Sequence, residues 1–292
     1  MIQEKYAMTS QSERSYCEKY AATQFTGQGA MIELGCWLGS LTNSLANGLK
    51  KNELIRKKEG SILVFDYYQW DVIMEDWVLG TPYANRIEVG GNFKILFDET
   101  TESNAKYIQA TQCDLTNYKW DRGSIEFMII DSMKTYPLCQ NIISSFYPSL
   151  IQDDGLIFHQ DYIHFFHSWI HLSLYWLRDY FETVEYIRHS NTVILKNTKS
   201  IPQDLLKLPQ SMNDYEIDFI DQAFQWNLDQ APDFAKPFIA AANTMCYVHR
   251  HEQEAAREHW LIFAKKGFTD TQPFKEMQGF CERFQLCNFS DL

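Results

Sequence analysis

Between residues 28 and 199, short apolar runs alternate with longer stretches in which apolar positions recur at helical spacing. Short apolar runs bounded by polar residues are typical of buried strands. The predicted strands are residues 30–34, 61–65, 107–111, 125–130 and 156–160, and the clearest predicted helices are residues 38–50, 136–150 and 163–181. This alternation predicts an α/β fold with a mostly parallel sheet covered by helices.

The chain after the fifth strand changes its pattern twice. Residues 183–189 and 192–196 are β-rich runs joined by Ser190 and Asn191, which predicts a hairpin and an antiparallel last strand. Residues 200–292 lack strand patterning and contain helical runs, at 214–227 and 238–266, which predicts a helical appendage. The predicted organisation is an N-terminal helical lid segment (1–27), a sheet domain (28–199) and the appendage (200–292).

One connection within the sheet region is longer than the others. Residues 67–103 exceed what a simple crossover needs, and they contain two tryptophans, a proline and a Gly-Gly pair. We expect this segment to cover one end of the sheet and to form a wall of the substrate site.

Composition narrows the class of protein. The chain has 292 residues, 45% hydrophobic and 22% charged, enough for one large domain or for one domain with an appendage. No apolar run approaches bilayer length and the first residues do not resemble a signal peptide, so we expect a cytoplasmic protein without membrane contact. The seven cysteines form no CxxC pair, which argues against a disulfide framework or a zinc cluster. The net charge of −12 makes nucleic acid an unexpected partner.

Glycines and acids follow the predicted strands, at the edge where open parallel sheets bind ligands. Glu33, Gly35 and Gly39 have the spacing E-x-G-x-x-x-G, and the two glycines would let a ligand approach the backbone beside the start of the next helix. Asp66 follows the second strand, where a carboxylate can accept both hydroxyls of a ribose, with the ring of Tyr67 beside it for a base.

Asp114 follows the third strand, where its carboxylate suits an exocyclic amine. In this order the three strand ends resemble the class I S-adenosylmethionine-dependent methyltransferases over residues 28–199. The resemblance implies a Rossmann-like seven-stranded methyltransferase sheet, mostly parallel with an antiparallel last strand. It also implies that the glycine loop faces the methionine end of S-adenosylmethionine, that the second acid holds the ribose and that the third lies near the adenine. The predicted cofactor-binding residues are Glu33, Gly35, Trp37, Gly39, Ser40, Asp66, Tyr67 and Asp114.

The fourth and fifth strands end in two further acids, Asp131 and Asp161. Carboxylates at neighbouring strand ends can converge on one hard divalent cation, and Mg²⁺ is the predicted ion. Gln160 is a further oxygen donor, although an ideal strand directs its side chain to the face opposite Asp161. The Asp131-x-x-Lys134 motif resembles the catechol-type and macrocin-type metal-dependent O-methyltransferases. In the macrocin-type enzymes the fifth strand is followed by an adjacent pair of acids, whereas Asp161 is flanked by Gln160 and Tyr162. The metal requirement is therefore left open.

The same resemblance implies roles for the motif. Asp131 would bind the metal and, as in the catechol-type enzymes, Lys134 would take the proton from the acceptor hydroxyl, provided that the cation and burial lowered its pKa. Helical spacing would place Lys134 one turn beyond Asp131. His159 is the second candidate base.

Three further histidines, His164, His167 and His171, have the spacing of one helix face. They are interpreted either as a general base or transition-metal site or, with greater weight, as a partly buried polar stripe among aromatic residues.

The predicted function is transfer of a methyl group from S-adenosylmethionine to a hydroxyl of a sugar or specialised metabolite, with Mg²⁺ assistance left open. An N-methyltransferase without metal is an alternative, and so is a non-catalytic protein of the same fold that binds a partner. An NAD-dependent oxidoreductase is disfavoured because GxGxxG is absent. A homo-oligomer, with the appendage as contact or as a cap on the acceptor pocket, is left open.

Overall fold

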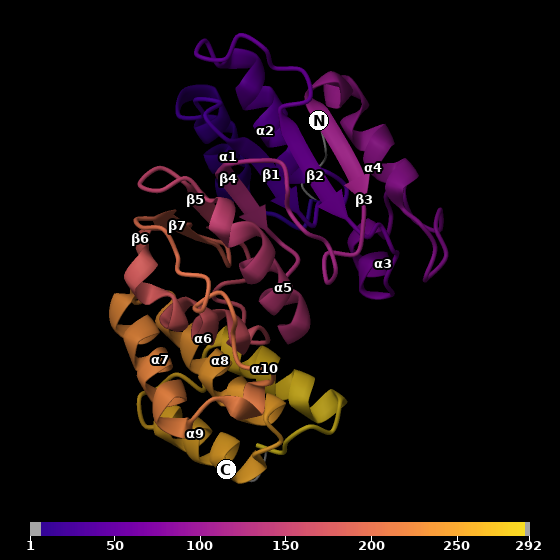
Figure 1. Ribbon diagram of the computed structural model, residues 1–292. Helices are drawn as coiled ribbons and strands as arrows, with labels where there is room; N and C mark the ends of the chain where they lie inside the picture. The colour runs from indigo at the N-terminus through magenta and orange to yellow at the C-terminus, as the bar shows by residue number, and fades with distance from the viewer. Residues whose placement is uncertain (1–6, 290–292) are drawn as a thin grey trace.

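The computed structural model describes residues 7–289, and a seven-stranded sheet lies at the centre of the molecule (Figure 1). Its strands are β1 (Ala30–Leu34), β2 (Ile62–Asp66), β3 (Ile108–Gln112), β4 (Ile125–Ile130), β5 (Leu156–His159), β6 (Phe181–Tyr186) and β7 (Val193–Asn197). They lie in the order β3-β2-β1-β4-β5-β7-β6. β7 is antiparallel to both β5 and β6, while β1 to β5 pair in parallel.

This strand order confirms the predicted fold class. The order reverses between β1 and β4, as in doubly wound sheets, and the antiparallel β7 inserts beside β5. It is the arrangement of the Rossmann-like methyltransferase sheet. The five predicted parallel strands agree with the observed ones to within a residue at each end, whereas the run predicted at 183–189 is observed earlier in the chain, as β6.

Helices cover both faces of the sheet because the central strands are buried on both sides. Every residue of β4 is buried, whereas β3 and β6, at the two edges, alternate with exposed positions. One face packs against α1 (Gln11–Thr23), α2 (Ser40–Lys51) and α4 (Lys94–Thr101), and the other against α5 (Tyr136–Phe146) and α6 (Ser168–Trp176). Short 3₁₀ turns are η2 (Glu102–Tyr107), η3 (Tyr147–Ser149), η4 (Arg178–Tyr180) and η5 (Met212–Asp214).

The N-terminal segment is part of the covering layer. Helix α1 begins with a capping box in which Ser10 and Glu13 bond each other's backbone N–H groups. Its Tyr20 ring stacks on Phe127 of β4 at 4.1 Å between centroids. A Cβ on Gly48 of α2 would lie 2.1 Å from the Glu18 carbonyl, so the two helices touch at the backbone. Residues 1–6 of the predicted lid segment lie outside the described residues.

The long connection after β2 contains α3 (Ile73–Val78) and lies beyond the carboxyl ends of β1 and β2. Its inner side supplies a buried aromatic cluster around Trp70 and Phe93, while Val72, Ile73 and Leu79 are exposed.

Residues after β7 form α7 (Ile217–Gln230), α8 (Lys236–His249), α9 (Gln253–Ala264) and α10 (Gln272–Arg283), grouped beside α6 in Figure 1. The predicted run at 238–266 is thus a helical hairpin, and α10 was not predicted. These helices share one continuous core with the sheet face under α5 and α6. Among the described residues, no helix is both long and apolar enough to cross a membrane.

Candidate active site

The turn from β1 into α2 is built on two left-handed glycines. Gly35 has φ +84° and Gly39 has φ +74°, a region that strains other residues. A Cβ on Gly35 would lie 2.7 Å from the Asp131 carbonyl oxygen, and one on Gly39 would lie 2.5 Å from the Thr101 side chain. On the Cβ side of both glycines the protein's own chain fills the space, so close packing within the protein already requires glycine at both positions. Cofactor contact through the rest of the loop stays a prediction.

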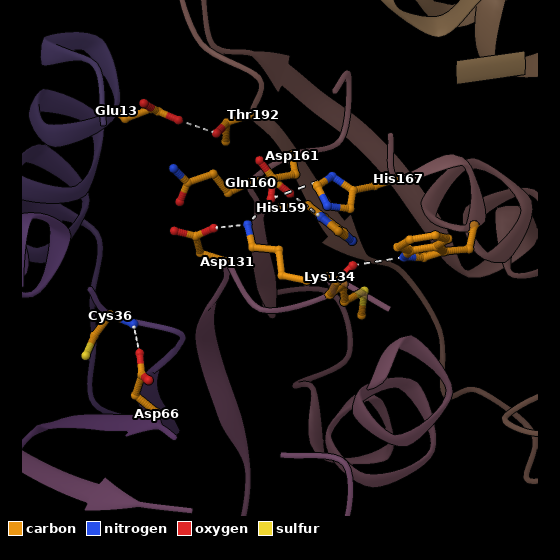
Figure 2. Close-up of polar contacts among 12 residues, drawn as sticks. Glu13, Cys36, Asp66, Asp131, Lys134, His159, Gln160, Asp161, His167 and Thr192 are labelled. Carbon is orange, nitrogen blue, oxygen red and sulfur yellow. Dashed lines mark hydrogen bonds and ion pairs between the residues drawn. The ribbon is translucent and has the colours of Figure 1, made fainter. Parts of the chain in front are cut away.

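Asp66 holds this turn in place. Its Oδ2 accepts the Cys36 N–H at 2.7 Å (Figure 2). Its Oδ1 accepts the Tyr68 N–H, also at 2.7 Å. The side chain is only partly buried, and each carboxylate oxygen can accept a second donor. Asp66 thus ties the first loop to the second strand end and keeps capacity for a ligand's hydroxyls.

Two residues of the predicted cofactor set are turned into the protein. Glu33 is 1% exposed and accepts a hydrogen bond from Thr42 Oγ1 at 2.5 Å. Burial raises the pKa of Glu33. Ser40 is buried as well, and its hydroxyl pairs with that of Thr9 at 2.6 Å. In this conformation both side chains bond protein groups instead of lining the lip of the sheet.

The two aromatic residues of that set differ from each other. Trp37 has φ +48°, is buried, and packs with Trp70 at 5.3 Å and Phe93 at 5.6 Å between ring centroids. Tyr67 is 56% exposed. Trp37 therefore supports the loop, whereas Tyr67 is accessible to a ligand.

Asp114 is exposed beyond the end of β3, where it accepts bonds from Thr116 and Asn117. Those bonds from Thr116 lower the pKa of Asp114. The residue shapes its own turn and lies at the same sheet edge as Asp66, since β2 and β3 are parallel neighbours.

Lys134 lies between the two acids that were predicted to share a cation. Its Nζ donates to Asp131 Oδ1 at 2.7 Å and to Asp161 Oδ2 (Figure 2). Burial acts to lower the pKa of Lys134, but the two carboxylates raise it overall. Without a cation, Lys134 is therefore an ion-pair partner of both acids, and its role as a base stays a prediction that depends on a bound cation. The expected helical turn from Asp131 to Lys134 is wrong, because α5 begins only at Tyr136 and the two residues are joined by a loop.

The same geometry bears on the predicted magnesium site. Asp131 and Asp161 do converge, as expected from adjacent strands, but on the ammonium of Lys134. Within residues 7–289, no three His, Cys, Asp or Glu side chains group as a metal site would require. A divalent cation would have to displace Lys134, so the residues fit the ion poorly and we assign no step to it.

The chain makes a sharp turn at the end of β5. The strand ends at His159, and Asp161 has φ +59°, a left-handed conformation that Asp tolerates better than most residues. Strand alternation therefore stops at this point, and Gln160 and Asp161 line one cavity instead of opposite faces. The expected separation of their side chains is wrong for this reason.

His159 is a buried neutral base. It is 3% exposed, and its Nδ1 lies 3.0 Å from the Gln160 carbonyl oxygen. Burial lowers the pKa of His159 to about 4. At neutral pH the imidazole is unprotonated, and Nε2 keeps its lone pair if Nδ1 carries the proton toward the carbonyl.

The three other histidines do not share a helix face. Helix α6 begins at Ser168, so His164 and His167 precede it in a turn and His171 lies within it. The His167 Nδ1 is 3.8 Å from Asp161 Oδ2, and burial lowers the pKa of His167 to about 3. His171 is fully buried against Tyr162 and Phe224. Their aromatic surroundings agree with the interpretation as a buried stripe.

A cavity of about 550 Å³ opens beside Gln160 and Asp161. Three of its walls come from segments that the sequence placed near the site without naming a residue's role: Glu13 from the lid segment, Trp77 from the long connection, and Phe234 and Phe238 from the appendage. The capping-box spacing Ser10-x-x-Glu13 could have located the helix start, but no local signal connects Glu13 with a site at β5.

The sequence matches no protein-family model and no curated protein. Among solved structures it is similar to the 23S rRNA methyltransferase ErmE, at 13% identity over 86% of this chain and 88% of that one, with a TM-score of 0.37. It is also similar to coclaurine N-methyltransferase bound to N-methylheliamine and SAH, at 13% identity over 80% of this chain and 62% of that one, with a TM-score of 0.31. Likenesses this distant carry no functional argument, and the fold assignment rests on the strand order.

Proposed function

We propose that this chain is an S-adenosylmethionine-dependent methyltransferase acting on a small molecule. The observation that carries the proposal is Asp66 at the end of β2, bonded to the Cys36 N–H of the loop after β1. Open parallel sheets bind ligands beyond the strand ends where strand order reverses, and this loop lies at the reversal between β1 and β4.

The side chains at that edge fit the cofactor. The remaining acceptor capacity of Asp66 suits the ribose hydroxyls, and the exposed Tyr67 ring suits the adenine. Among the described residues, the buried Ser132 Oγ has no hydrogen-bond partner, and its Cβ lies next to Gly35. A buried hydroxyl without a partner is costly, so a ligand that bonds it would be stabilised. When bound, the cofactor supplies an electrophilic methyl group on a sulfonium.

The cavity beyond β5 is the proposed acceptor site. Asp131 and Asp161 end adjacent strands, so this cavity borders the proposed cofactor edge. Phe234 and Phe238 form part of its wall, which supports the proposal that the appendage caps the acceptor pocket.

The predicted hydroxyl acceptor, on a sugar or specialised metabolite, needs a group that removes its proton. Because Lys134 is held as an ammonium, that task would fall to His159 or to one of the acids. An amine acceptor has no such requirement once it is deprotonated, and this favours the N-methyltransferase alternative. The oligomeric state and a cytoplasmic location remain expectations from the sequence.

Calorimetric titration of the full-length protein with S-adenosylhomocysteine and, separately, with NAD tests the proposal. We expect S-adenosylhomocysteine to bind and NAD not to bind. Binding of NAD alone would favour an oxidoreductase, and binding of neither would favour a non-catalytic protein of this fold.

A further inference from the structure

The cavity beside β5 has walls from distant parts of the chain. The start of α1 contributes Glu13, the end of β5 contributes Gln160 and Asp161, and the turn between β6 and β7 contributes Asn191. At about 550 Å³ it has the size of a small-molecule site.

The charged groups of this cavity are acidic. Glu13 and Asp161 line it, and none of its described lining residues is a lysine or an arginine. Burial raises the pKa of Glu13, and its two oxygens accept from Thr192 and Ser10, so Asp161 is the carboxylate open to a ligand. Lys134 bonds Oδ2 of Asp161, which leaves Oδ1 able to accept from a ligand. The chain as a whole carries a net charge of −12, which adds to the attraction for cations. Phosphates and carboxylates are therefore poor occupants.

Gln160 is an acceptor that lacks a donor. The residue is 7% exposed, it lines the cavity, and within the described residues its Oε1 has no hydrogen-bond partner. In the view of Figure 2 its side chain lies between those of Glu13 and Asp131. That oxygen is buried in this rotamer, and a half-turn of the side-chain amide would present it to a ligand N–H in the cavity, which would relieve the cost of the missing hydrogen bond.

Aromatic rings form another part of the wall. Trp77, Phe234 and Phe238 line the cavity together with Ile163. Aromatic faces attract cations and also bury the apolar body of a ligand. Trp77 is 43% exposed and Phe234 is 37% exposed, so part of this surface is uncovered.

From these observations we infer that the cavity binds a protonated primary or secondary amine carried on an aromatic or apolar body. The ammonium donates to Gln160 Oε1 and to the free oxygen of Asp161, and the body lies among Trp77, Phe234 and Phe238. The inference rests on the proposed function only in calling this amine the methyl acceptor. As acceptor it first releases one proton to solvent. Its lone pair then forms the N–C bond as the sulfonium S–C bond breaks, and the neutral thioether leaves.

Matched fragments test the inference directly. Tryptamine and 2-phenylethylamine are titrated into the full-length protein beside tryptophol and 2-phenylethanol, which replace the ammonium by a hydroxyl, with methyl glucoside as a sugar probe. Hydrogen bonds to charged groups contribute about 1.5–3 kcal/mol, so each amine should bind at least ~10-fold more tightly than its alcohol. Alcohols that bind as well as the amines, methyl glucoside as the tightest probe, or no amine binding would each overturn the inference.

Variants locate the binding. Gln160→Leu should weaken tryptamine at least ~5-fold and change tryptophol less, since it removes one acceptor to a charged donor. Gln152→Leu is the matched control, because Gln152 is exposed at the other end of β5. If Gln160→Leu does not fold, Trp77→Ala serves instead, and it should weaken both amine and alcohol. Amine binding unchanged in the folded variant would place the amine elsewhere.

S-adenosylhomocysteine binding separates the two hypotheses. If the protein binds the amines but not S-adenosylhomocysteine, the amine-site inference stands and the proposed methyltransferase function is refuted. If it binds S-adenosylhomocysteine but prefers the alcohols, the proposed function stands and the amine-site inference is refuted.

Discussion

Replacing Lys134 by Met removes the ammonium between Asp131 and Asp161 and keeps the length of the side chain. Loss of one partner from a buried ion pair costs about 3–5 kcal/mol, whereas an exposed pair contributes about 0–1 kcal/mol. The Lys134 side chain is 48% exposed and those of the acids 22% and 18%, so solvent screens the interaction in part. We expect Lys134→Met to lower the free energy of unfolding by about 1–2 kcal/mol at pH 7.

The loss should depend on pH in a defined direction. In the wild type the pKa of Lys134 is raised, so Lys134 is an ammonium in the folded protein at both pH 4.5 and pH 7, and only the charge of its carboxylate partners changes over this range. In the variant, the two facing carboxylates repel each other, which raises the folded-state pKa of the pair above that of the unfolded chain. The folded variant then binds more protons than the unfolded chain and gains stability as the pH falls. The difference between variant and wild type should therefore be smaller at pH 4.5 than at pH 7.

Urea unfolding at both pH values, followed by circular dichroism, measures this difference. Lys236→Met is the control, because Lys236 pairs with Asp233, which is 97% exposed, and should show little change with pH. Unaltered stability of Lys134→Met at pH 7, or a loss that grows on acidification, would refute the bridging role of Lys134.

Three further predictions concern the cofactor edge, the first loop and the appendage. Asp66→Ala should weaken S-adenosylhomocysteine by about 2 kcal/mol or more in calorimetry, and Asp114→Ala should weaken it less; equal effects would remove the distinction between the two acids. Gly39→Ala should lower the free energy of unfolding in urea by about 1–3 kcal/mol, because it combines a left-handed φ with a steric clash. Gly279→Ala in α10 should raise that free energy by about 0.5–1 kcal/mol, because a Cβ there meets no atom within 4 Å. Removal of residues 200–292 should abolish cooperative unfolding because those helices share the core of the sheet domain, and a folded, monomeric truncation would contradict this.

Local patterns in the sequence predicted most of the sheet. The strand at residues 125–130 is apolar throughout because β4 is buried on both faces, and such a run is visible without any neighbour. The acid after β2 was likewise predictable, since parallel strands place their carboxyl ends at one edge. The antiparallel hairpin of β6 and β7 followed from its two β-rich runs and the short turn between them.

The chemistry of that edge depended on contacts between residues far apart in the chain. Asp131 and Asp161 were expected to converge, but which cation lies between them is decided by the loop that brings Lys134 back to both. The direction of the Lys134 pKa shift follows from its contacts with these two carboxylates. The spacing of the three residues along the sequence does not specify those contacts.

Backbone conformation decided the cavity. The strand pattern directs Gln160 and Asp161 to opposite faces, yet the left-handed φ of Asp161 places both in one cavity with Glu13, which lies some 150 residues earlier in the chain. Hydrophobic periodicity reports which face of an element is buried, because burial is a property of each residue and its near neighbours. It carries no information on which distant element supplies the opposite wall, and that wall determines which ligand the cavity accepts.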